Sequence, residues 1–243
     1  MSISVAVVGA GGKMGQLAIR LIEESHDLEL HAAIGSADSL DGVAGADVVL
    51  DFTLPQASQL VVEHAVGLGI STVTGTSGWS AERIASLAPF VAKSPGVGVL
   101  VIPNFSLGSV LATSLAARAA RYFDSIEIIE AHHAGKVDSP SGTAVRTAEL
   151  IGEARENLGP VIAPHADQRA RGQQVASVPI HSLRMQGVLA KQEVRLGGTG
   201  ELLTITHETL SSDSYESGIL LALRAAPGIE GVVVGLDKLL EDL

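Results

Sequence analysis

Residues 5–21 read VAVVGAGGKMGQLAIRL, and this stretch decides the fold of the first part of the chain. A β-branched apolar run leads into Gly9, Gly12 and Gly15, and a helical pattern of apolar residues follows. Glycines between a strand and a helix allow a tight turn, and the helix N-terminal amides can bind a pyrophosphate. The stretch therefore predicts a dinucleotide-binding turn. Because the spacing differs from G-x-G-x-x-G, although Gly9 and Gly11 supply a G-x-G, a close turn without a ligand stays open as the alternative.

Apolar strand patterns alternate with helical patterns on either side of this turn and as far as residue 104. We expect strands at 3–8, 28–34, 47–52, 70–74 and 97–102, and helices at 13–24, 55–67 and 80–92. Such alternation is typical of right-handed βαβ crossovers, which give a parallel sheet with helices on both faces. The predicted fold class is therefore α/β, with a Rossmann-like doubly wound sheet.

The pattern changes after residue 104 and indicates a second, inserted domain. We expect helices at 110–120 and 143–157, a strand at 126–131, a long surface loop at 158–174, and strands at 177–184, 187–196 and 201–207. The glycine-containing segments 186–187 and 197–200 are typical of turns between antiparallel strands. A helix at 215–226 and a strand at 231–236 can return to the first sheet. We therefore predict a dinucleotide-binding domain of residues 1–104 and 214–243, and an α+β domain of mixed sheet, residues 105–213, for substrate binding and oligomerisation.

Composition excludes several classes of function. The 243 residues include 46% hydrophobic and 3% aromatic residues, carry a net charge of -11, and contain no cysteine. The acidic charge argues against nucleic-acid binding, and the missing cysteines exclude disulfides and thiolate zinc sites. The sequence shows no signal-peptide pattern and no apolar run of the roughly 18 residues that a membrane span needs. We therefore expect a cytoplasmic protein without nucleic-acid or membrane partners.

Two further loops follow predicted parallel strands. One is GTSG at 75–78 and the other is PNFS at 103–106. Ligands of open α/β sheets bind at the carboxyl ends of the strands, so these loops are expected at the same edge as the first glycine-rich turn. Taken singly, each could also be an ordinary turn.

The most unusual stretch is EAHHAGKVDSPSGTA at 130–144. His132 and His133 point in opposite directions if the strand continues through them, and such a pair seldom binds one metal ion, so no metal site is predicted. Ser141 is a good N-cap, and the free amides of the next turn can bind an anion. Together with Lys136, these groups could bind a small dianionic substrate and donate protons near neutral pH. The alternative interpretation is that these residues are ordinary solvent-exposed polar side chains that bind no ligand.

These motifs, taken in order, resemble those of one enzyme family. GAGGKMG at 9–15, DFT at 51–53, GTSG, PNFSLG at 103–108, the His/Lys stretch and PIHSLRMQG at 179–187 are similar to the motif set of 4-hydroxy-tetrahydrodipicolinate reductases, also called dihydrodipicolinate reductases. The resemblance covers nearly the whole chain. It implies reduction of 4-hydroxy-tetrahydrodipicolinate to tetrahydrodipicolinate by NADH or NADPH, in the diaminopimelate route to lysine. Because family members are commonly tetramers, it also implies a homotetramer.

The resemblance assigns roles to individual residues. His132 would be a proton donor or acceptor and Lys136 a proton donor, while His133, Ser141, Gly142 and Thr143 would bind the dicarboxylate substrate. The implied cofactor-binding residues are Gly9, Ala10, Gly11, Gly12, Lys13, Met14, Gly75, Thr76, Ser77, Ile102, Pro103, Asn104 and Phe105. One position departs from the family pattern, because Gly35 stands where family members usually carry an acid that binds the adenine ribose. The choice between NADH and NADPH therefore stays open.

Two alternatives also remain open. A reductase-like paralogue would keep the motifs but act on a different dicarboxylate, and a dinucleotide-sensing regulator would keep the glycine turn without needing proton donors. Another nicotinamide dehydrogenase would share the first domain but would have no need of the His/Lys stretch.

Overall fold

The computed structural model describes residues 2–240, and these residues form two compact units. One unit holds the described residues up to Ser106 and those from Tyr215 onward, and the other is Leu107–Ser214. Met1 and residues 241–243, which the predicted first domain includes, lie outside the described residues.

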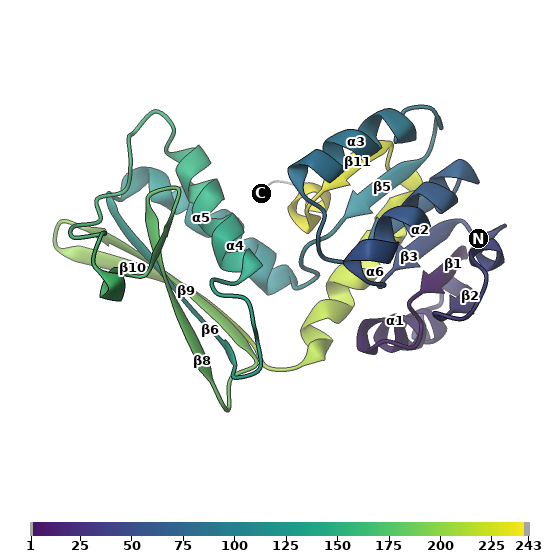
Figure 1. The fold of residues 1–243 in the computed structure, drawn as a ribbon, viewed down its shortest axis with the longest axis horizontal. Helices are drawn as coiled ribbons and strands as arrows, with labels where there is room; N and C mark the ends of the chain where they lie inside the picture. Colours follow the sequence, from purple (N-terminus) through teal and green to yellow (C-terminus); the bar gives the residue numbers. More distant parts are fainter. Residues whose placement is uncertain (1, 241–243) are drawn as a thin grey trace. The chain divides into compact units, whose positions relative to one another are not determined.

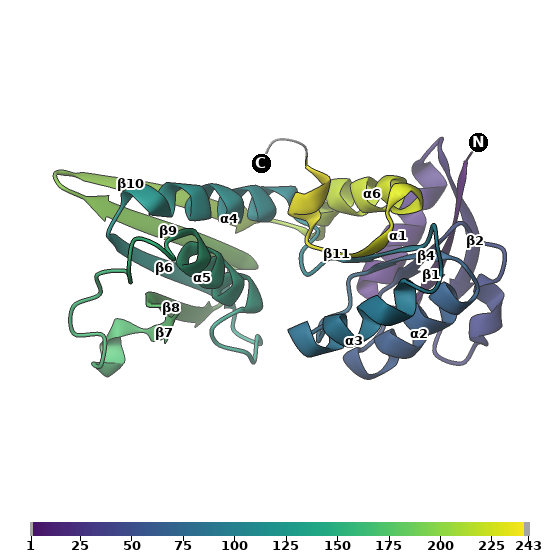
Figure 2. The ribbon, with the colours of Figure 1, turned by 90° about the horizontal axis from the view of Figure 1, so that it is seen from above.

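The first unit is a six-stranded parallel sheet with helices on both faces (Figures 1 and 2). Its strands are β1 (Ile3–Val8), β2 (Leu28–Ile34), β3 (Val48–Asp51), β4 (Ser71–Thr74), β5 (Gly98–Val101) and β11 (Gly231–Val234), in the order β11-β5-β4-β3-β1-β2. The helices are α1 (Lys13–Glu24) and α6 (Glu216–Ala225) on one face, and α2 (Pro55–Gly67) and α3 (Ala81–Val91) on the other (Figure 2). The order reverses between β1 and β3, and ligands of doubly wound sheets bind at such a reversal. The predicted doubly wound fold is confirmed.

The sequence explains why this sheet is buried on both faces. β3, β4 and β5 are buried along their whole length, and they are short runs rich in valine, leucine and threonine. β11 pairs in parallel with β5 from Gly231 to Val234, so the C-terminal segment does return to the first sheet. Helices α2 and α3 bury Val62, Val66 and Leu87 against this part of the sheet. Burial of apolar area on both faces is what stabilises such a layered fold.

The second unit is a five-stranded mixed sheet covered by two helices. Its elements are α4 (Leu107–Ala119), β6 (Ser125–His133), α5 (Gly142–Ala154), β7 (Gln173–Val175), β8 (Val178–Met185), β9 (Ala190–Gly198) and β10 (Glu201–Thr209). The strand order is β10-β9-β6-β8-β7. A mixed sheet in the second part of the chain is thus confirmed, and β9 and β10 form the predicted antiparallel hairpin.

Two details of the predicted second unit are wrong. The turn near Gly187 does not join paired strands, because β6 lies between β8 and β9, parallel to the first and antiparallel to the second. The loop expected at 158–174 ends in the edge strand β7, whose sequence QQV has no strand-like apolar alternation. Pairing with β8 rather than local propensity makes β7 a strand, as is common at sheet edges.

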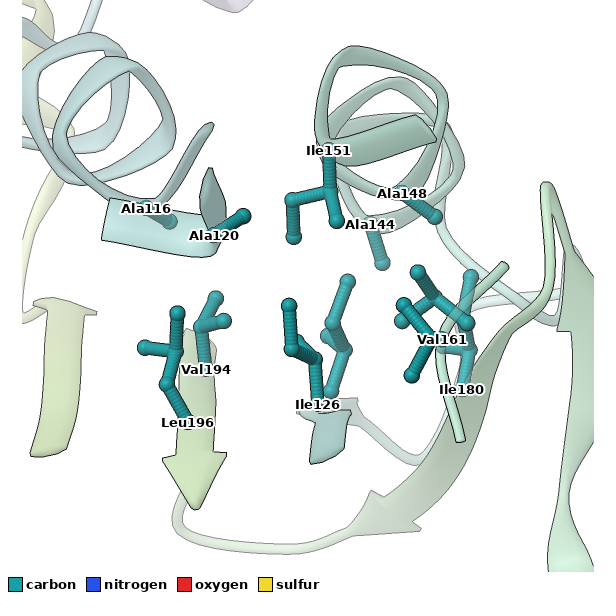
Figure 3. Close-up of a cluster of buried hydrophobic side chains, with 12 residues drawn as sticks. Ala116, Ala120, Ile126, Ala144, Ala148, Ile151, Val161, Ile180, Val194 and Leu196 are labelled. Carbon is teal, nitrogen blue, oxygen red and sulfur yellow. The ribbon is translucent and has the colours of Figure 1, made fainter. Parts of the chain in front are cut away.

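The core of the second unit lies between the sheet and its helices (Figure 3). Ala144, Ala148 and Ile151 of α5 face Ile126 and Ile180 of the sheet, and all five side chains are buried. Small alanines on the helix let it approach the sheet closely, so its N-terminus is held at a fixed place beside the end of β6. No helix within residues 2–240 combines the length and the apolar character that crossing a membrane requires.

Candidate active site

The glycine-rich turn between β1 and α1 combines close packing with open space. Gly9 has φ +89°, and a Cβ on it would lie 2.4 Å from the carbonyl oxygen of Phe52. A Cβ on Gly15 would lie 2.3 Å from the carbonyl oxygen of Gly9, so this glycine lets α1 pack on the turn. A Cβ on Gly11, in contrast, would meet no described atom within 4 Å, whereas a Cβ on Gly12, the N-cap of α1, would lie 3.3 Å from the carbonyl oxygen of Gly9. The exposed backbone at 11–12 and the first amides of α1 fit a pyrophosphate.

Two other loops converge on the same edge of the sheet. A Cβ on Gly75 would lie 2.4 Å from the ring of Phe52 and 2.5 Å from the ring of Phe105, and these rings pack edge to face at 5.5 Å. Only glycine therefore fits at position 75. The loops after β1, β3, β4 and β5 are thus packed together at the carboxyl edge, as the parallel order requires.

The predicted cofactor residues differ in what they present at this edge. Gly11, Gly12, Lys13, Ser77 and Pro103 are exposed, and Gly9, Ala10, Met14, Gly75 and Asn104 are partly exposed. Thr76, Ile102 and Phe105 are buried, so their side chains shape the loops from below. Their assignment to the cofactor stays a prediction.

A buried acid organises the loops after β3 and β4. The side chain of Asp51 is fully buried and accepts hydrogen bonds from the hydroxyls of Thr74 at 2.7 Å, Thr53 at 2.6 Å and Ser58. The backbone amide of Gly75 donates to the backbone carbonyl of Asp51 at 3.0 Å. Asp51 therefore links the last residues of two strands to the turn at 75.

The end of β2 carries an acid that the sequence pattern did not assign. The backbone amide of Gly35 donates to Oδ2 of Asp38 at 2.8 Å, and a Cβ on Gly35 would lie 3.3 Å from the same oxygen. The carboxylate of Asp38 thus lies where an acidic side chain at position 35 would begin. The turn from Gly35 to Asp38 therefore places a carboxylate at the end of β2. The only sign of this in the sequence was an aspartate shortly after the predicted strand.

The second unit places His132 beside a fully buried carboxylate. His132 is near the end of β6, and its Nδ1 lies 2.5 Å from Oε2 of Glu130, two residues earlier on the same face of the strand. The side chain of Glu130 is 0% exposed and that of His132 is 16% exposed. Arg184 of β8 donates to both carboxylate oxygens of Glu130, at 2.9 Å each. This bidentate arrangement is the strongest hydrogen-bonding geometry for an arginine and a carboxylate.

The charges around His132 have opposing effects on its protonation. Burial lowers the pKa of His132, and the hydrogen bond and negative charge of Glu130 oppose this, while the charges of Lys136 and Arg184 lower it further. Burial would by itself raise the pKa of Glu130, but hydrogen bonds led by those of Arg184 lower it overall, so this carboxyl is ionised near neutral pH. His132 is accordingly neutral near pH 7 in the free protein.

The remaining predicted substrate residues lie just beyond β6. Lys136 forms an ion pair of 2.8 Å with Asp138, and its amide donates to the carbonyl of His133 at 3.1 Å. His133 is exposed and follows His132 on the strand, so the two rings lie on opposite faces. Hydrogen bonding with Lys136 lowers the pKa of Asp138.

Ser141 connects the start of α5 to the buried acid. Its side chain caps the helix by accepting from the amide of Ala144 at 3.3 Å, and its own amide donates to Oε1 of Glu130 at 3.3 Å. The expected N-cap is therefore confirmed, and α5 begins at Gly142, one residue before the predicted start. Gly142 is exposed, with no described atom within 4 Å of the place that a Cβ would take, and Thr143 is partly exposed.

In the second unit, His132, Lys136, Ser141 and Thr143 thus lie around the end of β6. Within residues 2–240, no group of three or more His, Asp or Glu side chains could hold a metal ion.

Glu130 and Arg184 are the members of this cluster that sequence reasoning missed. Glu130 lies within the quoted His/Lys stretch, and its two-residue offset from His132 was the available signal, because residues two apart share a strand face. Arg184 is 54 residues away from Glu130, and only the parallel pairing of β6 with β8 brings it there.

Comparisons with known proteins agree over both units. Residues 3–105 match the family model described as dihydrodipicolinate reductase, N-terminus, and residues 108–240 match the model described as dihydrodipicolinate reductase, C-terminus. The chain belongs to the dihydrodipicolinate reductase family. The resemblance in the motifs is therefore confirmed, and with it an oxidoreductase that uses NADH or NADPH.

Individual relatives of this family match over the full length of the chain. The 4-hydroxy-tetrahydrodipicolinate reductase of Clavibacter michiganensis is 61% identical over 99% of this chain and 87% of the relative. That of Streptomyces griseus is 45% identical over 98% of both chains. A dipicolinate-bound dihydrodipicolinate reductase from a Paenisporosarcina species has a TM-score of 0.85 at 31% identity, covering 99% of this chain and 100% of that one.

Proposed function

We propose that this chain reduces 4-hydroxy-tetrahydrodipicolinate to tetrahydrodipicolinate with NADH or NADPH, in the diaminopimelate route to lysine. The observation that carries this proposal is the cluster around the end of β6, where His132, Lys136 and the N-terminus of α5 lie together in a chain of this family. The names of the relatives support the reaction, and the relative solved with dipicolinate supports a small dicarboxylate substrate.

The groups in the second unit suit a dianion that must be protonated. The first amides of α5, at Gly142 and Thr143, lie beyond the cap of Ser141 and can bind one carboxylate. Lys136 would exchange Asp138 for the substrate, since a dianion offers more negative charge than one exposed carboxylate. His133 would bind the substrate from the other side of the strand.

His132 is proposed to handle the proton. In the free protein burial keeps its ring neutral, but a bound dianion adds negative charge nearby and raises the pKa of the ring. The enzyme would therefore take up a proton as the substrate binds. The 4-hydroxyl of the substrate would leave as water, and His132 or Lys136 would deliver the proton to the ring that has received the hydride. A nicotinamide cofactor supplies the hydride when bound.

The first unit is proposed to hold that cofactor. The exposed backbone at Gly11 and Gly12 would bind the pyrophosphate, and the loops at 75–77 and 102–105 would bind the rest of the nucleotide at the carboxyl edge. The carboxylate of Asp38 would accept hydrogen bonds from the adenine ribose and would repel a 2′-phosphate. We therefore propose a preference for NADH over NADPH.

We also propose that the protein is a cytoplasmic homotetramer. Support comes from the apolar side chains that the second unit leaves exposed on its sheet, including Leu183 and Met185 of β8 and Leu202 of β10. Light scattering tests the assembly, because four chains of 24.9 kDa each give a mass distinct from that of a dimer.

The deciding experiment is a steady-state assay with freshly generated product of the dihydrodipicolinate synthase reaction, run with NADH and NADPH in parallel. We expect turnover with both cofactors and a higher kcat/KM with NADH. Binding of cofactor without turnover would favour a dinucleotide sensor. Turnover only with another cyclic imine diacid would favour a paralogue with a different substrate.

A further inference from the structure

Glu130 is the most completely enclosed charged side chain of the second unit, and its carboxylate has polar partners on several sides. It is 0% exposed, and its carboxylate accepts from both terminal nitrogens of Arg184, from Nδ1 of His132 and from the amide of Ser141. Burying a carboxylate is costly unless it is paired and hydrogen-bonded, so a surface interpretation does not explain this residue. Each partner belongs to a different part of the site: the strand β8, the histidine, and the start of α5.

The contact with His132 determines which ring nitrogen carries the proton. An ionised carboxylate can only accept hydrogen bonds, so Nδ1 of His132 must be the donor. Nε2 is then left without a proton in the neutral ring and is the nitrogen that can accept one and pass it on.

Arg184 keeps this carboxylate in place. It lies opposite His132 in the parallel pairing of β6 and β8, and its fork contacts both oxygens of Glu130. The same guanidinium donates to the carbonyl of Asp138 at 2.5 Å, so it also joins the loop that carries Lys136. A lysine could supply the charge here but not the two parallel hydrogen bonds.

We propose that Glu130 is a positioning residue that holds the imidazole of His132 with Nδ1 protonated and Nε2 directed away from it as the atom that accepts and delivers the catalytic proton, and that Arg184 positions Glu130. The inference rests on the proposed function only in giving His132 the proton to handle. The tautomer itself is a property of the free protein and is measured without substrate.

The first test therefore uses the unaltered protein. Nitrogen-15 NMR of the histidine rings, with His132 assigned from the spectrum of His132→Ala, reports which nitrogen is protonated in the neutral ring. We expect a protonated Nδ1 and an unprotonated Nε2 above the pKa. The opposite tautomer, or an even mixture of the two, overturns the proposal whether or not the chain reduces dihydrodipicolinate.

The second test removes the charge of Glu130. In Glu130→Gln the shape is kept, but the negative charge that favours protonated His132 is lost, so the pKa of His132 falls further and the tautomers mix. We expect kcat to fall by about 10²-fold, the lower range for losing a general acid, with KM changed less than about 3-fold. The limb of the kcat profile that reports His132 should move to lower pH. In Arg184→Lys we expect a loss of about 10-fold in kcat, because the charge remains but the fork is lost.

The chain offers a matched control on the same strand. Glu127 of β6 also joins an arginine and a histidine, accepting from Arg171 and lying 2.8 Å from Nε2 of His181, but on the opposite strand face. Glu127→Gln should leave kcat, its pH profile and the His132 resonances unchanged.

The readouts separate the proposal from its premises. If Glu130→Gln lowers kcat but leaves the tautomer and the pKa of His132 as in the unaltered protein, the role of Glu130 is merely structural and the proposal is wrong. If Glu130→Gln shifts the tautomer and the pKa of His132, but the unaltered chain has no activity with the synthase product, the positioning role of Glu130 is supported and the proposed reaction is wrong. If Glu130→Gln does not fold, the tautomer of the unaltered protein and Arg184→Lys still decide the question.

Discussion

Asp51 in the first unit and Glu130 in the second are both fully buried acids near the end of a strand, yet their surroundings differ. Asp51 is held by hydroxyls of Thr53, Ser58 and Thr74, whereas Glu130 is held by a guanidinium and an imidazole. Hydroxyl donors fix a shape without a titrating partner, and this suits loops that must fit a cofactor. A charged pair with a histidine couples shape to protonation, and this suits chemistry.

The difference extends to how each unit presents its site. The first unit presents backbone, since Gly9 and Gly75 lie where a Cβ would meet Phe52 within 2.4 Å. The second unit presents side chains that can bind anions and move protons. Substitutions should therefore change stability and cofactor affinity in the first unit, but kcat and its pH dependence in the second.

The largest effect should come from the second unit. In His132→Ala we expect kcat to fall by about 10² to 10⁴-fold, the usual range for removing a general acid or base, with cofactor affinity unchanged. Because burial lowers the pKa of His132, the ring of the free enzyme loses its proton at a lower pH than an ordinary histidine does, and the kcat/KM profile should lose this limb in the variant. Steady-state kinetics across pH measure both effects. The neighbouring His133→Ala should mainly raise KM, and full activity in His132→Ala would contradict the proposed site.

The corresponding change in the first unit should act on stability. Asp51→Ala leaves the buried hydroxyls of Ser58 and Thr74 and the partly buried hydroxyl of Thr53 without this acceptor. We therefore expect the free energy of unfolding to fall by about 3 kcal/mol, since each unsatisfied buried group costs roughly 1 to 3 kcal/mol. Urea denaturation measures this. The control is Asp47→Ala, at the exposed residue just before the same strand, where the amide of Ser4 loses a partner, and we expect less than about 1 kcal/mol there. Equal losses of unfolding free energy in Asp51→Ala and Asp47→Ala would show that the buried hydrogen bonds of Asp51 do not stabilise the fold more than an exposed one does.

The glycine turn allows a finer test of packing against ligand binding. In Gly9→Ala we expect a loss of about 2 kcal/mol or more in unfolding free energy, because of the φ of +89° and the contact with the carbonyl of Phe52. In Gly11→Ala the new methyl meets no described atom, so stability should be kept while the dissociation constant for NADH rises. Thermal unfolding and fluorescence titration with NADH separate the two. Unchanged NADH affinity in Gly11→Ala would move the pyrophosphate away from this turn.

Substrate binding in the second unit should respond to Thr143. In Thr143→Val we expect KM to rise by about 10- to 100-fold and kcat to change little, since one hydrogen bond to a charged group contributes roughly 1.5 to 3 kcal/mol. The bond that Thr147 donates to the backbone carbonyl of Thr143 does not depend on this side chain. Thr143→Ser keeps the hydroxyl and should restore the low KM. A fall in kcat alone would instead assign Thr143 to the chemistry.

The smallest effect should come from the exposed acid at the end of β2. Asp38→Asn keeps an acceptor for the amide of Gly35 but removes the charge that repels a 2′-phosphate. We expect the ratio of NADH to NADPH affinity to fall by about 3-fold, since an exposed charge is screened by solvent. Titration with both cofactors measures the ratio, and Asp41→Asn, at another exposed acid, should leave it unchanged. Gly35→Asp is a poorer test, because its Cβ would lie 3.3 Å from Asp38.

Much of the fold could be predicted from local pattern. The glycines at 9–15 lie between a strand and a helix, and the alternation up to residue 104 indicated the doubly wound sheet that the structure has. Ser141 could be identified as an N-cap because the signal of a cap lies within a few residues of it. Such features depend on neighbours in sequence, which a single chain displays directly.

Other features were decided only by the tertiary structure. The turn at Gly187 exists, but the insertion of β6 between β8 and β9 made the predicted antiparallel pairing across it wrong, because strand order depends on which distant faces are buried together. The same insertion brings Arg184 to Glu130 across 54 residues, and so decides the surroundings of His132. The sequence by itself determined the two kinds of fold and the stretch that we propose carries the chemistry. The long-range pairing of strands decided which charges meet there, since hydrogen bonds between strands join residues that no local pattern relates.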